Sequence, residues 1–129
     1  MPYANPADQK KYERAWYLKN KEKVAKRSRI NERNRRERIY RKVAEYLSIH
    51  PCVDCGEDDV LVLEFDHVRG KKLGEIVNMI HRGSSWEDIL AEIEKCDVRC
   101  ANDHRRKTAQ RGNHFKFRWV VELAGRVVA

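Results

Sequence analysis

Side chains that can bind metals or move protons fall in three short groups along the middle of the chain. In order, they are Cys52-x-x-Cys55 followed by Gly56, then Asp66-His67, then Cys100-x-x-Asp103-His104. A pair of cysteines two residues apart, followed by a glycine that permits positive φ, is typical of one half of a zinc site. The chain has four cysteines, and Cys96 is the one that lies outside these groups. The four lack the spread of a secreted disulfide framework, so their spacing favours metal binding.

Two strands are expected to carry these groups. Residues 60–68 have the β-branched and aromatic content of a strand that ends at Asp66-His67. The residues expected on one face of this strand are Leu61, Leu63 and Phe65. Residues 96–100 are expected to form a short second strand. A helix capped by Asn102 or Asp103 should follow it to Gly112, with His104 near its start.

A long basic helix is expected before the first cysteine pair. Residues 10–42 hold fifteen Lys or Arg against four acids, with no Pro or Gly. The apolar residues at helical spacing near its end are Ile39, Val43, Tyr46 and Leu47. Only these last turns should pack on a core, and Pro51 should end the helix.

The connection between the two strands and the tail complete the expected elements. A short helix is indicated by Ile76, Met79 and Ile80. A second helix, capped by Ser84 or Ser85, repeats apolar residues at steps of three and four. The tail from residue 113 to 129 is compatible with either a strand or a helix packed on the module.

Composition favours nucleic acid as the partner. The chain of 129 residues is 37% charged with a net charge of +8, and its pI is about 9.5, values that favour binding to a polyanion. It holds no run of about 18 apolar residues and no apolar segment of a signal peptide at its start. We therefore expect a cytoplasmic protein that does not associate with membranes.

Together, the three groups resemble the HNH endonuclease family in its ββα-metal form. The resemblance rests on the segments CVDCG, LEFDHV, EIEKC and CANDHRRKT, and runs from about Tyr17 to Arg111. It implies an α+β fold in which a ββα-metal module with zinc knuckles follows a long basic helix. The expected parts are a basic helical arm at 1–48, the nuclease module at 49–112 and the tail at 113–129.

The resemblance also implies roles for individual residues. His67 would be the general base, because imidazole titrates near neutral pH. Asp66 and His104 would bind the catalytic ion, expected to be Mg²⁺, with Mn²⁺ or Ni²⁺ as substitutes. The implied reaction is nicking or double-strand cleavage of DNA with a single catalytic metal, leaving 5′-phosphate and 3′-hydroxyl ends. The resemblance further implies a location in the cytoplasm of a bacterial cell, for a protein encoded by the bacterium or by a phage.

Two features depart from the family pattern. The middle residue of the HNH triad, usually Asn, is not evident, and Lys95 or Cys96 stands in its place. Relatives also present a second CxxC before the histidine, where this chain has Asp103. A structural zinc bound by Cys52, Cys55, Cys100 and Asp103 is therefore expected. Cys96 is the other candidate ligand, although four residues of extended strand span roughly 13 Å, and weak or absent zinc is a third possibility.

Phosphate contacts are expected from two clusters of cations. The first is on the basic arm and the second follows His104. Their members are Arg33, Arg35, Arg36 and Arg38, and Arg105, Arg106, Lys107 and Arg111. Such contacts position a duplex without reading its sequence. His50, His81 and His114 have no motif partner and are interpreted as surface or loop residues.

Two other functions fit the same residues. The departures at the triad and at Asp103 are compatible with a noncatalytic, zinc-stapled DNA-binding protein. The basic arm would equally serve an RNA-directed nuclease.

Overall fold

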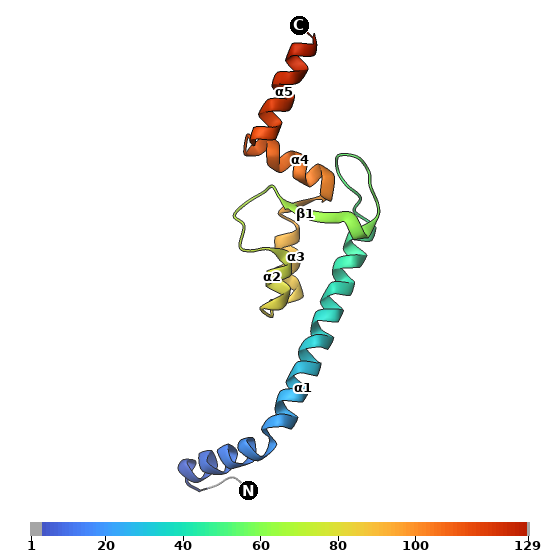
Figure 1. Cartoon of the computed structure of the whole chain (residues 1–129). Helices are drawn as coiled ribbons and strands as arrows, with labels where there is room; N and C mark the ends of the chain where they lie inside the picture. The colour runs from blue at the N-terminus through green and yellow to red at the C-terminus, as the bar shows by residue number, and fades with distance from the viewer. Residues whose placement is uncertain (1–3, 129) are drawn as a thin grey trace. The chain divides into compact units, whose positions relative to one another are not determined.

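A computed structural model describes residues 4–128 of the chain and shows helices with one two-stranded antiparallel sheet (Figure 1). The α+β class expected from the sequence is confirmed at this level. The chain divides into two compact units, residues 1–38 and 39–129. The division precedes the expected boundary at residue 48, because the last turns of the first helix contribute to the core of the second unit.

The first helix, α1, runs from Pro6 to Ser48. It begins earlier than the basic run, since Asn5 accepts a hydrogen bond from the backbone N–H of Ala7 and Pro6 suits the first helical position. Over residues 6–38 its side chains are largely exposed. These residues form a charged helix without a buried face of its own.

Two strands form the centre of the second unit. β1 is Leu63–His67 and β2 is Cys96–Cys100, and they pair antiparallel from Leu63 opposite Cys100 to His67 opposite Cys96. Residues 60–62, expected to be strand, instead form a 3-10 turn in which the Asp59 side chain accepts from the N–H of Leu61. Leu61 is 92% exposed and lies before β1, so the prediction that it shares a strand face with Leu63 and Phe65 was wrong.

Helices cover both faces of this sheet. The short helix α2 (Ile76–His81) and the helix α3 (Trp86–Ile93), which Ser85 caps, lie side by side on one face. On the other face, α4 (Ala101–Arg111) packs against both strands. α4 begins directly after β2 with Cys100 as its N-cap, in place of the expected Asn102 or Asp103.

The core lies between the sheet, α3 and the end of α1. Its two apolar clusters share Val43, Tyr46 and Phe65 at their edges. The buried members of the first are Ile39, Ile76, Met79, Ile80, Ile89 and Ile93. The second consists of Leu47, Cys52, Leu63, Val98 and Cys100. The docked face expected at the end of α1 is confirmed, and the second cluster includes two of the cysteines.

The tail forms a further helix, α5 (Phe115–Val128), which contacts α4. Over residues 115–125 most of its large apolar side chains are exposed, and Phe117 is half-buried. Those above half exposure are Phe115, Trp119, Val120, Val121 and Leu123.

Candidate functional site

Four potential metal ligands converge at the end of β2. One ligand atom from each of Cys52, Cys55, Cys100 and Asp103 lies within 4.8 Å of all the others. The Sγ atoms of Cys52 and Cys100 are each 3.4 Å from Oδ2 of Asp103, and the Sγ atoms of Cys55 and Cys100 are 3.8 Å apart. This is the ligand set expected from the sequence, and it could hold a metal ion.

The backbone around the cluster explains why these side chains meet. The N–H of Gly56 donates to the carbonyl of Cys52, closing a tight turn in which Gly56 adopts a φ of +78°. The N–H of Val53 donates to the carbonyl of Val98, which ties this turn to β2. The change from strand to helix at Cys100 then brings Asp103 beside the thiols.

Hydrogen bonds among these groups shift their titration. The hydrogen bond with Cys55, and to a smaller extent the one from Arg106, holds the pKa of Asp103 well below its usual range. The same carboxylate raises the pKa of the Cys55 thiol to about 12. Asp103 is thus a carboxylate surrounded by thiol donors, and a cation that replaced the thiol protons would take over these interactions.

Cys96 does not belong to the cluster. It lies at the opposite end of β2, where its Sγ donates to the carbonyl of Glu92 at 3.4 Å. Burial raises the pKa of this thiol to about 11. Of the two candidates for the fourth ligand, the structure brings Asp103 to the other cysteines and leaves Cys96 away from them.

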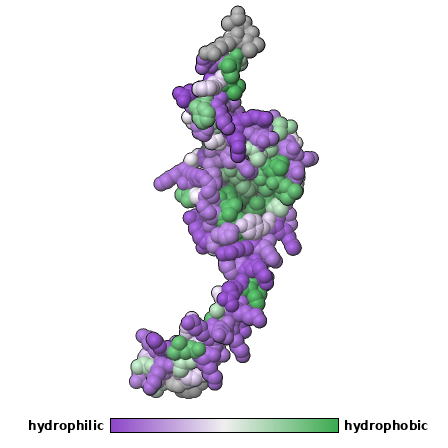
Figure 2. Space-filling model, viewed as in Figure 1, coloured by the Kyte–Doolittle hydropathy of each residue, from purple (hydrophilic) through white to green (hydrophobic). Residues whose placement is uncertain are grey.

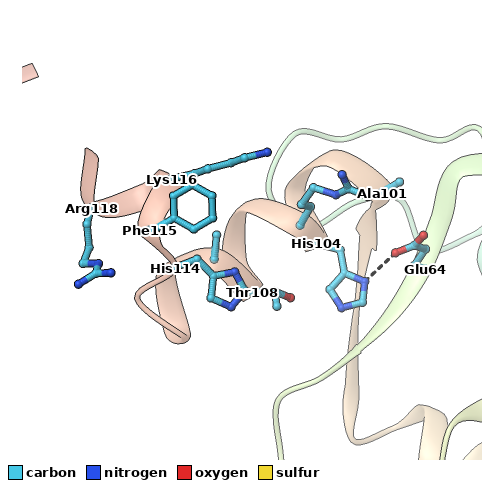
Figure 3. Close-up of a pocket in the computed structure, with 10 residues that line it drawn as sticks. Glu64, Ala101, His104, Thr108, His114, Phe115, Lys116 and Arg118 are labelled. Carbon is cyan, nitrogen blue, oxygen red and sulfur yellow. Dashed lines mark hydrogen bonds and ion pairs between the residues drawn. The ribbon is translucent and has the colours of Figure 1, made fainter. Parts of the chain in front are cut away.

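Asp66 and His104 lie side by side on the face of the sheet that α4 covers. Nε2 of His104 is 3.6 Å from Oδ1 of Asp66. Nδ1 of the same ring is 2.7 Å from Oε2 of Glu64, as Figure 3 shows. An ionised carboxylate can only accept, so Nδ1 of His104 donates to Glu64, and Nε2 is the ring nitrogen that faces Asp66. Metal-binding histidines commonly have such a carboxylate behind them, and sequence reasoning missed Glu64.

Asp66 is also bound by two arginines. Nη1 of Arg99 lies 2.5 Å from Oδ2, and Arg111 reaches both oxygens at 2.8 and 3.0 Å. Burial by itself would raise the pKa of Asp66, but the contacts with Arg111 and Arg99 outweigh it and leave the pKa below its ordinary value. Asp66 is therefore a charged, buried carboxylate.

The two arginines differ in how easily they could leave Asp66. Arg99 is buried and also bonds to Asp54, inside the Cys52–Cys55 turn, and to Asp97. Arg111 is exposed and pairs with Asp66 alone among the described residues. A cation shared by Asp66 and His104 would displace Arg111 rather than Arg99.

His67 points to the opposite face of β1. Its Nε2 is 3.0 Å from Oε1 of Glu92, a fully buried acid on α3. Burial would raise the pKa of Glu92, but hydrogen bonds from Lys95 and from the N–H of Leu73 lower it below its ordinary value. Glu92 was missed because this partner is 25 residues from His67. The signal in the sequence is an acid one residue before Ile93 on the apolar side of α3.

A groove of about 800 Å³ opens beside His104. Figure 3 shows His104 and Thr108 of α4 facing His114, Phe115 and Lys116 across it. Two cations also line the groove, Arg105 and Arg118. Of the histidines without a motif partner, His114 thus lies beside the candidate site, whereas His50 stacks on Tyr46 and His81 bonds to Tyr40.

The expected phosphate-binding cations fall into two kinds. In α4, Arg105 is exposed and Lys107 half-buried, while Arg106 pairs with Asp103 at 2.7 Å. In the arm, Arg33 and Arg38 are exposed. Arg35 and Arg36 lie 2.6 and 3.2 Å from Glu32. Figure 2 shows a mainly hydrophilic surface over residues 6–38 with isolated apolar side chains.

No protein-family profile, curated protein or solved structure matches this chain. Among residues 4–128, none of the helices combines the length and apolar character needed to cross a membrane.

Proposed function

We propose that this chain is a metal-dependent endonuclease of the HNH type that hydrolyses phosphodiester bonds in DNA. The observation that carries the proposal is the pairing of Asp66 with His104, backed by Glu64, on a two-strand and one-helix unit. His67 ends the same strand as Asp66. The resemblance in sequence assigns roles to these three residues. Asp66 and His104 lie together on one face of the sheet, and His67, the next residue along β1, lies on the other.

Zinc is the ion we propose for the cysteine cluster. Bond lengths of about 2.3 Å to sulfur and 2.0–2.2 Å to oxygen, at tetrahedral angles, separate two sulfurs by about 3.8 Å and a sulfur and an oxygen by about 3.5 Å. The corresponding distances here are 3.8 Å and 3.4 Å. Three thiolates also suit zinc better than Mg²⁺ or Ca²⁺, which prefer oxygen ligands. The role of this ion would be structural, since all four positions come from the protein.

Asp66 and His104 would hold the catalytic ion, proposed to be Mg²⁺. The test of fit is the distance of 3.6 Å between Nε2 of His104 and Oδ1 of Asp66, together with the bond from Nδ1 to Glu64, which turns Nε2 toward Asp66. The ion supplies charge stabilisation for the scissile phosphate and its leaving oxygen. Because Arg111 occupies the same carboxylate, binding of the ion requires it to leave, and a nearby phosphate is its natural new partner.

The remaining steps belong to the side chains. His67 takes a proton from the attacking water, which a neutral imidazole can do near pH 7. Arg105, Lys116 and Arg118 line the groove beside His104 and would hold phosphates next to the scissile one. Arg33 and Arg38 on the arm add contacts that bind DNA without reading its sequence.

A noncatalytic DNA-binding protein is the second candidate. The observation that favours it is the saturation of Asp66 by Arg99 and Arg111, which gives the carboxylate a structural role without any ion. The two candidates share zinc and DNA binding. They differ only in whether a second divalent ion leads to cleavage.

The test is nicking of supercoiled plasmid by zinc-loaded protein, with Mg²⁺ or Mn²⁺ added. We expect metal-dependent nicking by the wild type and its loss in His67→Ala and in His104→Ala, with zinc content and DNA affinity retained. His50→Ala is the matched control, because the His50 side chain bonds to and stacks on Tyr46, away from Asp66 and His104, and its loss should leave nicking unchanged. A folded wild type that binds DNA but does not nick it would support the second candidate.

A further inference from the structure

Glu92 is an acid on the buried face of α3. Its side chain has no exposed surface, and its neighbours on the helix face, Ile89 and Ile93, are fully buried core residues. An ionised carboxylate in such a place is costly unless charged or polar partners compensate it. Its partners therefore indicate why an acid stands where the core would accept an apolar residue.

Three donors surround this carboxylate. Nζ of Lys95 lies 2.8 Å from Oε2, and the N–H of Leu73 donates to Oε1 at 2.9 Å. These two contacts pin the loop before α2, because Nζ of Lys95 also donates to the carbonyl of Lys71. The third contact, 3.0 Å from Oε1 to Nε2 of His67, reaches across to the end of β1.

We propose that Glu92 is the positioning residue for His67. The inference rests on the proposed function, in which His67 accepts a proton from water. Because an ionised carboxylate only accepts hydrogen bonds, Nε2 of His67 must carry a proton, and the basic lone pair is then on Nδ1. Glu92 thereby fixes both the orientation of the ring and the nitrogen that reacts.

The surrounding backbone supports this assignment. The N–H groups of Val68 and Arg69, directly after His67, both donate to the carbonyl of Lys95 at 3.0 Å. His67 is thus held by its side chain and by the following backbone to one short segment, Glu92 to Lys95.

Glu92→Gln is the central variant. Glutamine has nearly the same shape. The Lys95 ammonium selects the amide oxygen at the position of Oε2, so the NH₂ group takes the position of Oε1. There it loses the bond from the N–H of Leu73, donates to Nε2 of His67 and moves the ring proton to Nδ1. The imidazole ¹⁵N shifts of His67 in the zinc-loaded full chain report the tautomer directly. We expect Nε2–H in the wild type and Nδ1–H in Glu92→Gln.

Turnover provides the second readout. General-base catalysis contributes about 10²- to 10⁴-fold, so we expect Glu92→Gln to lower the nicking rate at saturating DNA by about 10²-fold, with DNA affinity and zinc content unchanged. Glu92→Asp keeps the carboxylate and should retain the Nε2–H tautomer and recover part of the rate. Glu94→Gln makes the same chemical change at an exposed position of the same segment and should alter neither readout.

Either readout can overturn the proposal. The tautomer can be measured on the wild type alone. An Nδ1–H tautomer there would show that Glu92 does not hold His67 as described. An unchanged nicking rate in a folded Glu92→Gln would show that the contact is only structural. A wild type that shows the Nε2–H tautomer but never nicks DNA would instead refute the proposed function, so the two failures are distinguishable.

Discussion

Removal of the proposed structural zinc should destabilise the second unit strongly. The cluster of Cys52, Cys55, Cys100 and Asp103 joins the turn after α1, the end of β2 and the first turn of α4. Two of its members, Cys52 and Cys100, are also part of an apolar cluster. A domain of this size depends heavily on such a cross-link, because its core alone contributes little net stability.

The size of the effect follows from zinc binding. The free energy of zinc binding in zinc-finger peptides is roughly 10–16 kcal/mol at the standard concentration of 1 M. At a free zinc concentration of about 1 µM, dilution lowers this free energy by about 8 kcal/mol. The remaining stabilisation is about 2–8 kcal/mol. Since about 1 kcal/mol shifts the unfolding midpoint of a domain of this size by about 4–8 °C, chelation should lower the midpoint by at least about 8 °C.

Two variants identify the fourth ligand. Asp103→Ala removes a carboxylate oxygen from the cluster, and we expect its zinc affinity to fall by more than about tenfold, since even indirect partners of a metal contribute about 10- to 100-fold. Cys96→Ala is the matched control, because Cys96 is a buried thiol outside the cluster. Thermal unfolding with and without chelator, together with zinc content, measures both. Zinc retained by Asp103→Ala and lost by Cys96→Ala would refute the assignment.

Three further predictions concern the core, the arm and Arg111. Ile93→Ala, at a fully buried core position, should lower the free energy of unfolding by about 2–5 kcal/mol in a denaturant titration, and a change within 0.5 kcal/mol, as is usual for surface substitutions, would show that α3 does not pack as described. Arg33→Ala and Arg38→Ala should each reduce the slope of log affinity for DNA against log salt by about 1, and an unchanged slope would show that these exposed residues do not contact phosphate. Arg111→Met frees Asp66 from an exposed cation, so Mn²⁺ affinity, measured by electron paramagnetic resonance on zinc-loaded protein, should rise severalfold, whereas a fall would mean that Arg111 does not compete with the ion.

The features that could be predicted from the sequence are those encoded by local spacing. The cysteine pair with Gly56 is a local turn, and its meeting with Cys100 and Asp103 was implied by the resemblance to the HNH pattern, in which a second pair of ligands precedes the histidine. The docked turns of α1 were visible as apolar residues at helical steps. The first strand was predicted too long because Asp59 caps a 3-10 turn, a local side-chain bond that competes with the strand.

The features that could not be predicted depend on partners distant in the sequence. Glu92 and His67 are 25 residues apart, and Arg99 and Arg111 reach Asp66 from 33 and 45 residues away. Each contact depends on strand register and on which face a helix covers. A buried acid on an apolar helix face was the only local sign, and it indicates a partner without identifying it.

The central claim is that Asp66, His67 and His104 cleave DNA with a divalent ion, and one measurement tests it most directly. Zinc-loaded wild type is incubated with supercoiled plasmid and Mg²⁺, and the nicked product is then treated with DNA ligase. We predict Mg²⁺-dependent nicks that ligase seals, as 5′-phosphate and 3′-hydroxyl ends require, and no nicks with His67→Ala. A folded, DNA-binding wild type that leaves the plasmid intact, or nicks made equally well by His67→Ala, would contradict the claim.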